Sequence, residues 1–360
     1  MRIPGGNSIR SAVFAGLILF ASIFFVMYAR SNDSKVDGGE SLGSVFSNVS
    51  SVQLGKIPDT SEIVYISGQG FIYSMDRNGK HVTRITFEHP RNYEHAAVSF
   101  DHRYVIANEQ RPNPDKVPGA ISWLWLFDLA RGTESRLLPN FDTAGNGGVD
   151  WDPQGFIYFA AKRADVVPHP VTPNDFMDNA GANDIYRVRP NGTGLQRLIN
   201  TPRSGESDVS VSMDGKFVAH GNLAIVTNFS EIRFMNADGT NSRLVFRLPR
   251  IIADPELSPD NSRIVFSRVN LEVPPNWPNI PDLNTAHDIY TIKIDGTGLL
   301  RLTKPGPISI CPDWKDDLVI YTEMSERDHY KGIAVVKANL KDQAPRRILS
   351  MGHSAKWIPR

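Results

Sequence analysis

DIYTIKIDGTGLLRLTK, residues Asp288–Lys304, is the stretch that decides the fold, because the chain repeats it. Residues Asp184–Asn200 read DIYRVRPNGTGLQRLIN, and four looser copies follow the same pattern: Gly70–Thr86, Ser122–Leu138, Ser230–Leu248 and Ile333–Leu349. The copies recur at intervals of about 50 residues, a period typical of solenoids and propellers. We therefore predict that this chain of 360 residues is built mainly from one repeated structural unit.

Each copy has the pattern of a β-hairpin. In the quoted stretch, DIYTIKI and GLLRLT are rich in apolar and β-branched residues, and Asp295-Gly296 between them favours a tight turn. A second hairpin precedes each copy, for example Asp254–Ser267. Two hairpins make a four-stranded unit, whose strands we name A to D from the centre outward. Six such units predict an all-β, six-bladed β-propeller.

The first blade is expected to join both ends of the repeat region. Glu62–Ser67 reads as a strand B without a preceding strand A, and Ser354–Arg360 reads as a strand A without a following strand B. We therefore expect Ser354–Arg360 to be the inner strand of a blade whose other strands lie in Glu62–Thr86.

The amino-acid sequence of the repeats resembles that of one known family. SPDNSRIVFS at Ser258–Ser267, followed by DIY and DGTGLLRLT, is similar to the repeats of TolB-like six-bladed propellers, and the resemblance extends over Glu62–Arg360. It implies the propeller fold and does not assign an activity.

The N-terminal region is predicted to anchor the protein in a membrane. Ser11–Ala29 contains no charged residue, and as a helix it would span about 28 Å, close to the thickness of a bilayer core. A cleaved signal peptide is the alternative. Residues 1–10 carry Arg2 and Arg10, so we expect them in the cytoplasm. Residues 30–60 then form a flexible tether, and residues 61–360 form the propeller.

With this orientation, the propeller faces the periplasm, a lumen or the extracellular space. Four N-x-S/T sequons predict a glycoprotein if the compartment supports glycosylation: Asn32, Asn48, Asn191 and Asn228. The chain has 39 basic and 39 acidic residues, so no net charge favours binding to nucleic acid. Cys311 is the only cysteine, which excludes an intramolecular disulfide and a cysteine-rich metal site.

Three connections between strands B and C are enlarged and rich in proline. They are Glu109–Ile121, Lys162–Asn183 and Arg268–His287. In an up-and-down sheet all B–C connections leave from the same face, and insertions on one face of a repeat protein often mark its binding face. Tolerated surface insertion is the alternative interpretation.

Strand A of each blade should start at that face, so its first residues are expected to surround the mouth of the central channel. The predicted binding residues are Glu94, His95, His169, Asp208, Asp254, Trp277, His287 and His353. His95, His353, Asp208 and Asp254 offer nitrogen and oxygen ligands for a divalent metal ion. A solvated polar funnel and an acid/base site without metal remain open as alternatives. Trp277 is suited to stacking on a sugar ring or on a partner's side chain.

Two functions are compatible with this sequence. The first is a membrane-anchored binding or scaffolding protein that engages a protein or a glycan through its loop-rich face. The alternative is a metal-assisted polysaccharide lyase or hydrolase. The alternative rests on an analogy with oligogalacturonate lyases, which are metal-dependent enzymes built on a related propeller, and a shared fold does not establish a shared function.

Overall fold

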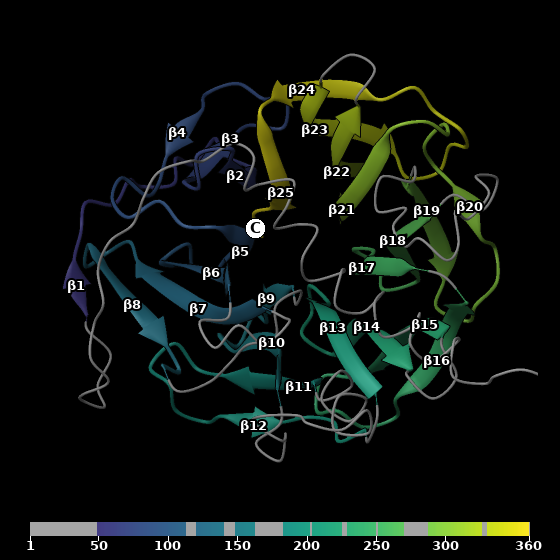
Figure 1. Ribbon diagram of the computed structural model, residues 1–360, viewed down its shortest axis with the longest axis horizontal. Helices are drawn as coiled ribbons and strands as arrows, with labels where there is room; N and C mark the ends of the chain where they lie inside the picture. The colour runs from purple at the N-terminus through teal and green to yellow at the C-terminus, as the bar shows by residue number, and fades with distance from the viewer. Residues whose placement is uncertain are drawn as a thin grey trace, which may run out of the picture.

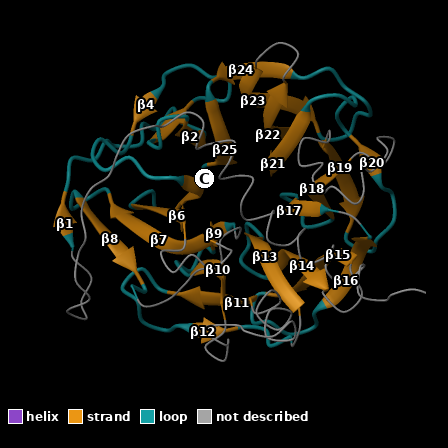
Figure 2. Ribbon diagram, in the orientation of Figure 1, coloured by secondary structure: helices purple, strands orange, loops and turns teal. Residues whose placement is uncertain are grey.

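In the computed structural model, the chain forms six β-sheets that surround a central axis like the blades of a propeller (Figure 1). The structure describes residues 49–112, 120–139, 148–162, 183–201, 204–224, 229–249, 251–269, 287–325 and 330–359. All regular secondary structure within these ranges is β-strand (Figure 2). The prediction of an all-β, six-bladed propeller is confirmed.

The strands of each blade follow in order from the axis outward. Blade 1 contains β25 (Gly352–Trp357), β2 (Ile63–Ser67), β3 (Ile72–Met75) and β4 (Thr83–Arg84); blade 2 contains β5 (Tyr93–Val98), β6 (Tyr104–Pro112), β7 (Ala120–Asp128), β8 (Thr133–Leu137) and β1 (Ser50–Ser51); blade 3 contains β9 (Val149–Trp151), β10 (Ile157–Lys162), β11 (Asn183–Val188) and β12 (Gln196–Arg197). Blade 4 contains β13 (Ser204–Val211), β14 (Phe217–Ala224), β15 (Phe229–Asn236) and β16 (Arg243–Leu248); blade 5 contains β17 (Ile252–Leu257), β18 (Arg263–Val269), β19 (His287–Lys293) and β20 (Leu300–Arg301); blade 6 contains β21 (Ile308–Lys315), β22 (Leu318–Ser325), β23 (Tyr330–Lys337) and β24 (Arg346–Ser350).

Blade 1 combines strands from opposite ends of the described chain. β25 pairs antiparallel with β2, and the register places Trp357 opposite Ile63 and Gly352 opposite Ser67. The inner strand thus begins two residues before the predicted start at Ser354. Apart from the added strand β1 of blade 2, the other five blades each use one continuous segment of the sequence.

The repeated stretch Asp288–Lys304 forms the outer hairpin of blade 5. It contains β19, the turn around Gly296 and β20, and Gly296 has a φ of 83° that this turn requires. Strands A and B form the inner hairpin of each blade. The start of every inner strand therefore lies at the end of the propeller opposite these outer turns.

The hydrophobic core is divided into six main clusters, one between each pair of neighbouring blades. Trp151 is buried between blades 2 and 3, and Trp357 is buried between blades 6 and 1. Trp314 packs against the cluster between blades 5 and 6. These tryptophans occupy one register of the inner strands, and that register belongs to the core between blades.

Residues 49–60 lie against the propeller, although the sequence assigns them to the flexible tether. β1 pairs with β8 at the edge of blade 2, and Leu54 bridges to Thr86 in blade 1. The predicted membrane segment, residues 11–29, lies outside the described residues. Within the described ranges, no helix is long and apolar enough to cross a membrane.

Candidate functional site at the channel mouth

The inner strands depart from regular pairing close to their starts. β13, β17 and β21 each shift register against the second strand of their blade. Asp208, Asp254 and Cys311 lie at these shifts with φ values of 47°, 53° and 49°, and Ser354 of β25 has a φ of 49°. A β-bulge interrupts the alternation of a strand and re-aims its side chains. The bulged residues here all line the central cavity.

One residue from each blade contributes to a ring around this cavity, which we call the mouth ring. Its members are His95, Gly148, Asp208, Asp254, Cys311 and Ser354. Gly148 contributes no side chain. His95, Asp208 and Asp254 remain partly exposed, so water reaches the ring.

The mouth ring and its neighbour Glu94 bring three carboxyl groups close together. Burial, reinforced by Asp208 and Asp254, raises the pKa of Glu94 well above its ordinary value. Burial and the neighbouring Asp254 raise the pKa of Asp208 to about 8. Within the described residues, no lysine or arginine forms an ion pair with Glu94, Asp208 or Asp254. These carboxyl groups therefore lie close together without a compensating cation.

In the next layer along the channel, a lysine balances the charge of the carboxyl groups. Asp150, Glu256, Asp313 and Lys356 follow the mouth ring by two residues on their strands, and the last three line the same cavity. The Lys356 ammonium lies 2.9 Å from a Glu256 oxygen and 3.3 Å from an Asp150 oxygen. Asp150 also accepts a hydrogen bond from the Val211 N–H of the next blade at 2.8 Å. This layer therefore holds the blades together.

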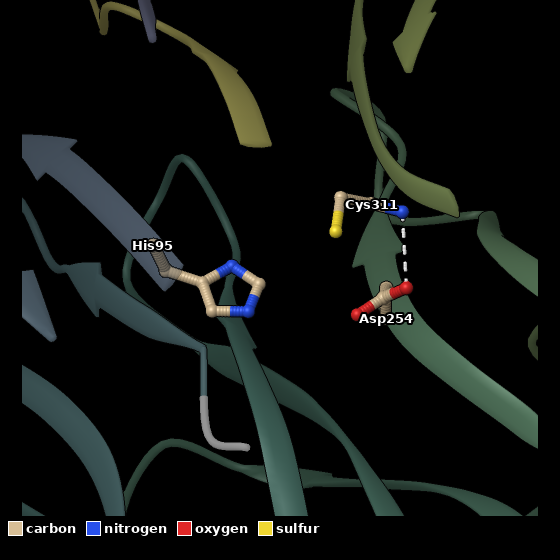
Figure 3. A group of neighbouring side chains, drawn as sticks. All are labelled: His95, Asp254 and Cys311. Carbon is tan, nitrogen blue, oxygen red and sulfur yellow. Dashed lines mark hydrogen bonds between the residues drawn. The ribbon is translucent and has the colours of Figure 1, made fainter. Parts of the chain in front are cut away.

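Three members of the mouth ring could hold a metal ion. The ligand atoms of His95, Asp254 and Cys311 all lie within 4.8 Å of one another. Figure 3 shows the imidazole, the thiol and the carboxylate around a common space, each on a different strand. One Asp254 oxygen, Oδ2, accepts the Cys311 N–H at 3.0 Å and the Ser267 hydroxyl at 3.0 Å. These two hydrogen bonds fix the orientation of the carboxylate.

The site lies in a propeller whose relatives can be recognised only by structure. No protein-family model matches the sequence, and no curated protein matches it. TolB from Acinetobacter baumannii superposes with a TM-score of 0.58 at 13% identity, over 83% of this chain and 67% of that one. A protein described as TolB from Agrobacterium tumefaciens gives 0.56 at 14% identity, over 84% and 99%. The fold is that of a TolB-like six-bladed propeller.

A nidogen/laminin complex also contains a chain of similar structure. That chain superposes on the TolB-like propeller with a TM-score of 0.55 at 11% identity, over 82% of this chain and 98% of the other. At identities this low the structural similarity shows the fold alone, and the function must be argued from the site itself.

The TolB-like propeller brings together four of the predicted residues. Glu94, His95, Asp208 and Asp254 gather at the mouth, as the register of the repeats predicts. His353 precedes the ring residue Ser354, and its Nδ1 lies 3.1 Å from the Ser354 hydroxyl. Burial, with Lys331 and His95 nearby, lowers the pKa of His353 to about 3.

The other predicted residues are not placed at the cavity. His287 is buried at the start of β19, opposite Val269, and does not line the channel. His169 and Trp277 lie outside the described residues. Cys311 was not predicted as a ligand. Its position in strand A, equivalent to those of His95 and Asp254, was the signal that could have identified it.

Proposed function

We propose that this protein is a membrane-anchored, extracytoplasmic binding protein whose TolB-like propeller engages a protein partner at the channel mouth. The observation that carries the proposal is the contrast between the two charged layers. Lys356 compensates the inner layer, whereas the mouth ring and Glu94 hold three carboxyl groups that pair with no lysine or arginine in the described part of the chain. Carboxyl groups in such a setting are costly to ionise, and strongly raised pKa values are found preferentially at functional sites. We infer that the bound state supplies the missing positive charge.

Two further points support a protein partner. The connections between β6 and β7, β10 and β11, and β18 and β19 all join strand ends on the mouth side, and these connections are enlarged in sequence. A propeller chain of similar structure occurs in the nidogen/laminin complex. That similarity supports protein binding only at the level of the fold. The membrane anchor rests on the uncharged segment Ser11–Ala29.

Site-specific photo-crosslinking in the native membrane tests the proposal. A crosslinking residue at Asn92, directly before β5, should give a discrete adduct, because it lies beside the mouth. The control position Thr297, in the turn between β19 and β20, is exposed at the opposite end and should give none. The double variant Glu94→Gln, Asp208→Asn should abolish the Asn92 adduct. Equal adducts from both positions, or no effect of the double variant, would contradict the proposal.

A hydrolase or lyase is the second candidate function. The grouping of His95, Asp254 and Cys311 favours it, because an imidazole, a carboxylate and a thiol can hold a catalytic metal or transfer protons. Incubation of the full-length protein with polyuronides and Zn²⁺, Mn²⁺ or Ca²⁺ should release new chain ends if this candidate is correct. If cleavage persists in the His95→Gln variant, the activity comes from a contaminating enzyme.

A further inference from the structure

We propose that His95, Asp254 and Cys311 bind one divalent transition-metal ion, and that the ligand set fits Zn²⁺ best. The three ligand atoms come from blades 2, 5 and 6 and lie within 4.8 Å of one another. Zn²⁺ accepts imidazole nitrogen, carboxylate oxygen and thiolate sulfur together, whereas Ca²⁺ and Mg²⁺ prefer oxygen ligands alone. The thiol of Cys311 is the residue that selects the softer ion.

The geometry requires only a small contraction. Bond lengths of about 2.0 to 2.3 Å imply ligand separations of about 3.3 to 3.8 Å around a tetrahedral ion. The present separations of up to 4.8 Å exceed these by about 1 Å, which side-chain rotation at His95 and Cys311 can supply. Asp254 needs the least adjustment, because its Oδ2 is already held by Ser267 and the Cys311 N–H.

The surroundings of the three ligands suit a cation. The Ser354 hydroxyl donates a hydrogen bond to the Cys311 sulfur at 3.8 Å. Burial and the nearby Asp254 nonetheless raise the pKa of this thiol, so a bound cation would have to stabilise the thiolate. Asp208 accepts the Asp254 N–H at 3.4 Å and places a second carboxyl group beside the site. Outer partners of this kind orient metal ligands and tune their affinity. The ion would also supply the positive charge that Glu94 and Asp208 lack.

Three protein ligands leave one position of a tetrahedral ion for an external group. Because water reaches the mouth ring, that position would be accessible to a water molecule or to a ligand atom of the partner. This role in recognition rests on the proposed function. The existence of the metal site is independent of the proposed function.

Titration of the metal-free, full-length protein with Co²⁺ tests the site. Co²⁺ replaces Zn²⁺ and reports thiolate coordination through a near-ultraviolet charge-transfer band. We expect one Co²⁺ per chain, a thiolate band, and displacement by Zn²⁺. Cys311→Ser should remove the band, and His95→Gln should weaken binding at least about tenfold. His81→Gln is the control, an exposed histidine in the outer turn of blade 1 that pairs with Asp76 away from the ligand set, and should bind normally.

A second measurement, made on the wild-type protein, tests the site even if the variants fail to fold. Because Cys311 is the only cysteine in the chain, alkylation of the wild-type protein reports on one thiol. Zn²⁺ should protect it from alkylation. Absence of a stoichiometric complex, a Co²⁺ spectrum without the thiolate band, or equal losses in His95→Gln and His81→Gln would overturn the inference.

The two proposals fail separately. If metal does not bind but the Asn92 adduct still depends on Glu94 and Asp208, the partner itself provides the positive charge through lysine or arginine, and only the metal inference is lost. If metal binds but no position at the mouth gives an adduct, the metal inference is supported and the proposed function is lost.

Discussion

Lys356 compensates the carboxyl groups buried along the channel. Burial by itself lowers the pKa of Lys356, but Asp150, Glu256 and Asp313 raise the pKa above its ordinary value, so the ammonium stays charged. The carboxyl groups respond in turn, because burial raises the pKa of Glu256 to about 8 although Lys356 opposes that shift. One lysine thus sets the charge balance of the layer beneath the mouth ring.

Replacing Lys356 with methionine should therefore destabilise the protein strongly. Removing one partner of a buried ionic cluster costs about 3 to 5 kcal/mol, because the remaining charges lose their compensation. Lys337→Met is the matched control, since Lys337 pairs with Asp317 at 3.5 Å while both side chains are exposed. That change should cost less than about 1 kcal/mol. Urea denaturation measures both, and equal losses would show that the layer does not depend on Lys356.

At the residue scale, the sequence predicted the acidic mouth better than the complete site. Glu94, His95, Asp208 and Asp254 could be placed because equivalent positions of similar blades face the same axis. Its position in strand A could have placed Cys311 at the mouth, but the distance from its thiol to His95 depends on how near blade 6 comes to blade 2 across the channel. The burial of His287 opposite Val269 could not be predicted, because it follows from strand pairing within blade 5.

The outer turns of blades 3 and 4 both contain a glycine with positive φ, but different atoms surround the two glycines. Gly239 and Gly192 both adopt positive φ, at 87° and 78°. A Cβ on Gly239 would lie 2.1 Å from the carbonyl oxygen of Leu198 in the neighbouring blade, whereas a Cβ on Gly192 would meet no atom within 4 Å. The turn of blade 4 therefore packs directly on the backbone of blade 3, and the turn of blade 3 does not pack on blade 2 in this way.

Alanine at these two glycines should separate backbone strain from packing between blades. Gly192→Ala should cost about 1 to 2 kcal/mol, the strain of a left-handed conformation alone. Gly239→Ala adds a steric clash with Leu198 and should cost about 1 to 3 kcal/mol more. Thermal unfolding of the two variants compares them directly. Equal melting temperatures would mean that the contact between blades 3 and 4 adjusts freely.

At the element scale, the hairpins were predictable because apolar residues and turn residues recur together. The bulges at Asp208, Asp254 and Cys311 were not, because one inserted residue changes which side chains face the channel without leaving a distinctive composition. β1 was missed for another reason. Ser50 and Ser51 have no strong strand preference, and their pairing depends on the edge that β8 presents.

At the scale of the whole molecule, β25 connects the last described residues to the first blade. It pairs with β2, and its Ala355 and Trp357 are buried in the cluster between blades 6 and 1. The Trp357 N–H donates to Asp313 at 2.5 Å, and the Ser354 N–H donates to the Thr322 hydroxyl at 2.8 Å. A single strand thus joins two blades that are adjacent in space and distant in sequence.

Deleting residues 354–360 should expose the inner edge of β2 and remove Trp357 from the core. We expect aggregation or loss of the cooperative transition, because both a sheet pairing and a buried aromatic side chain disappear. Removal of residue 360 alone is the control and should leave the transition unchanged. Circular dichroism and size-exclusion chromatography measure the outcome. An unchanged melting temperature after the longer deletion would show that the ring does not need β25.

The position of β25 also determines when, during synthesis, the site at the channel mouth becomes complete. Ser354 of the mouth ring and Lys356 of the layer beneath it both belong to this strand, so a chain that still lacks these residues has neither the hydroxyl beside Cys311 nor the cation beside Glu256. During synthesis β25 is made after the strands of the other five blades. Competence to bind should therefore arise only once β25 has joined blade 1, and a bound partner would distinguish closed rings from open ones.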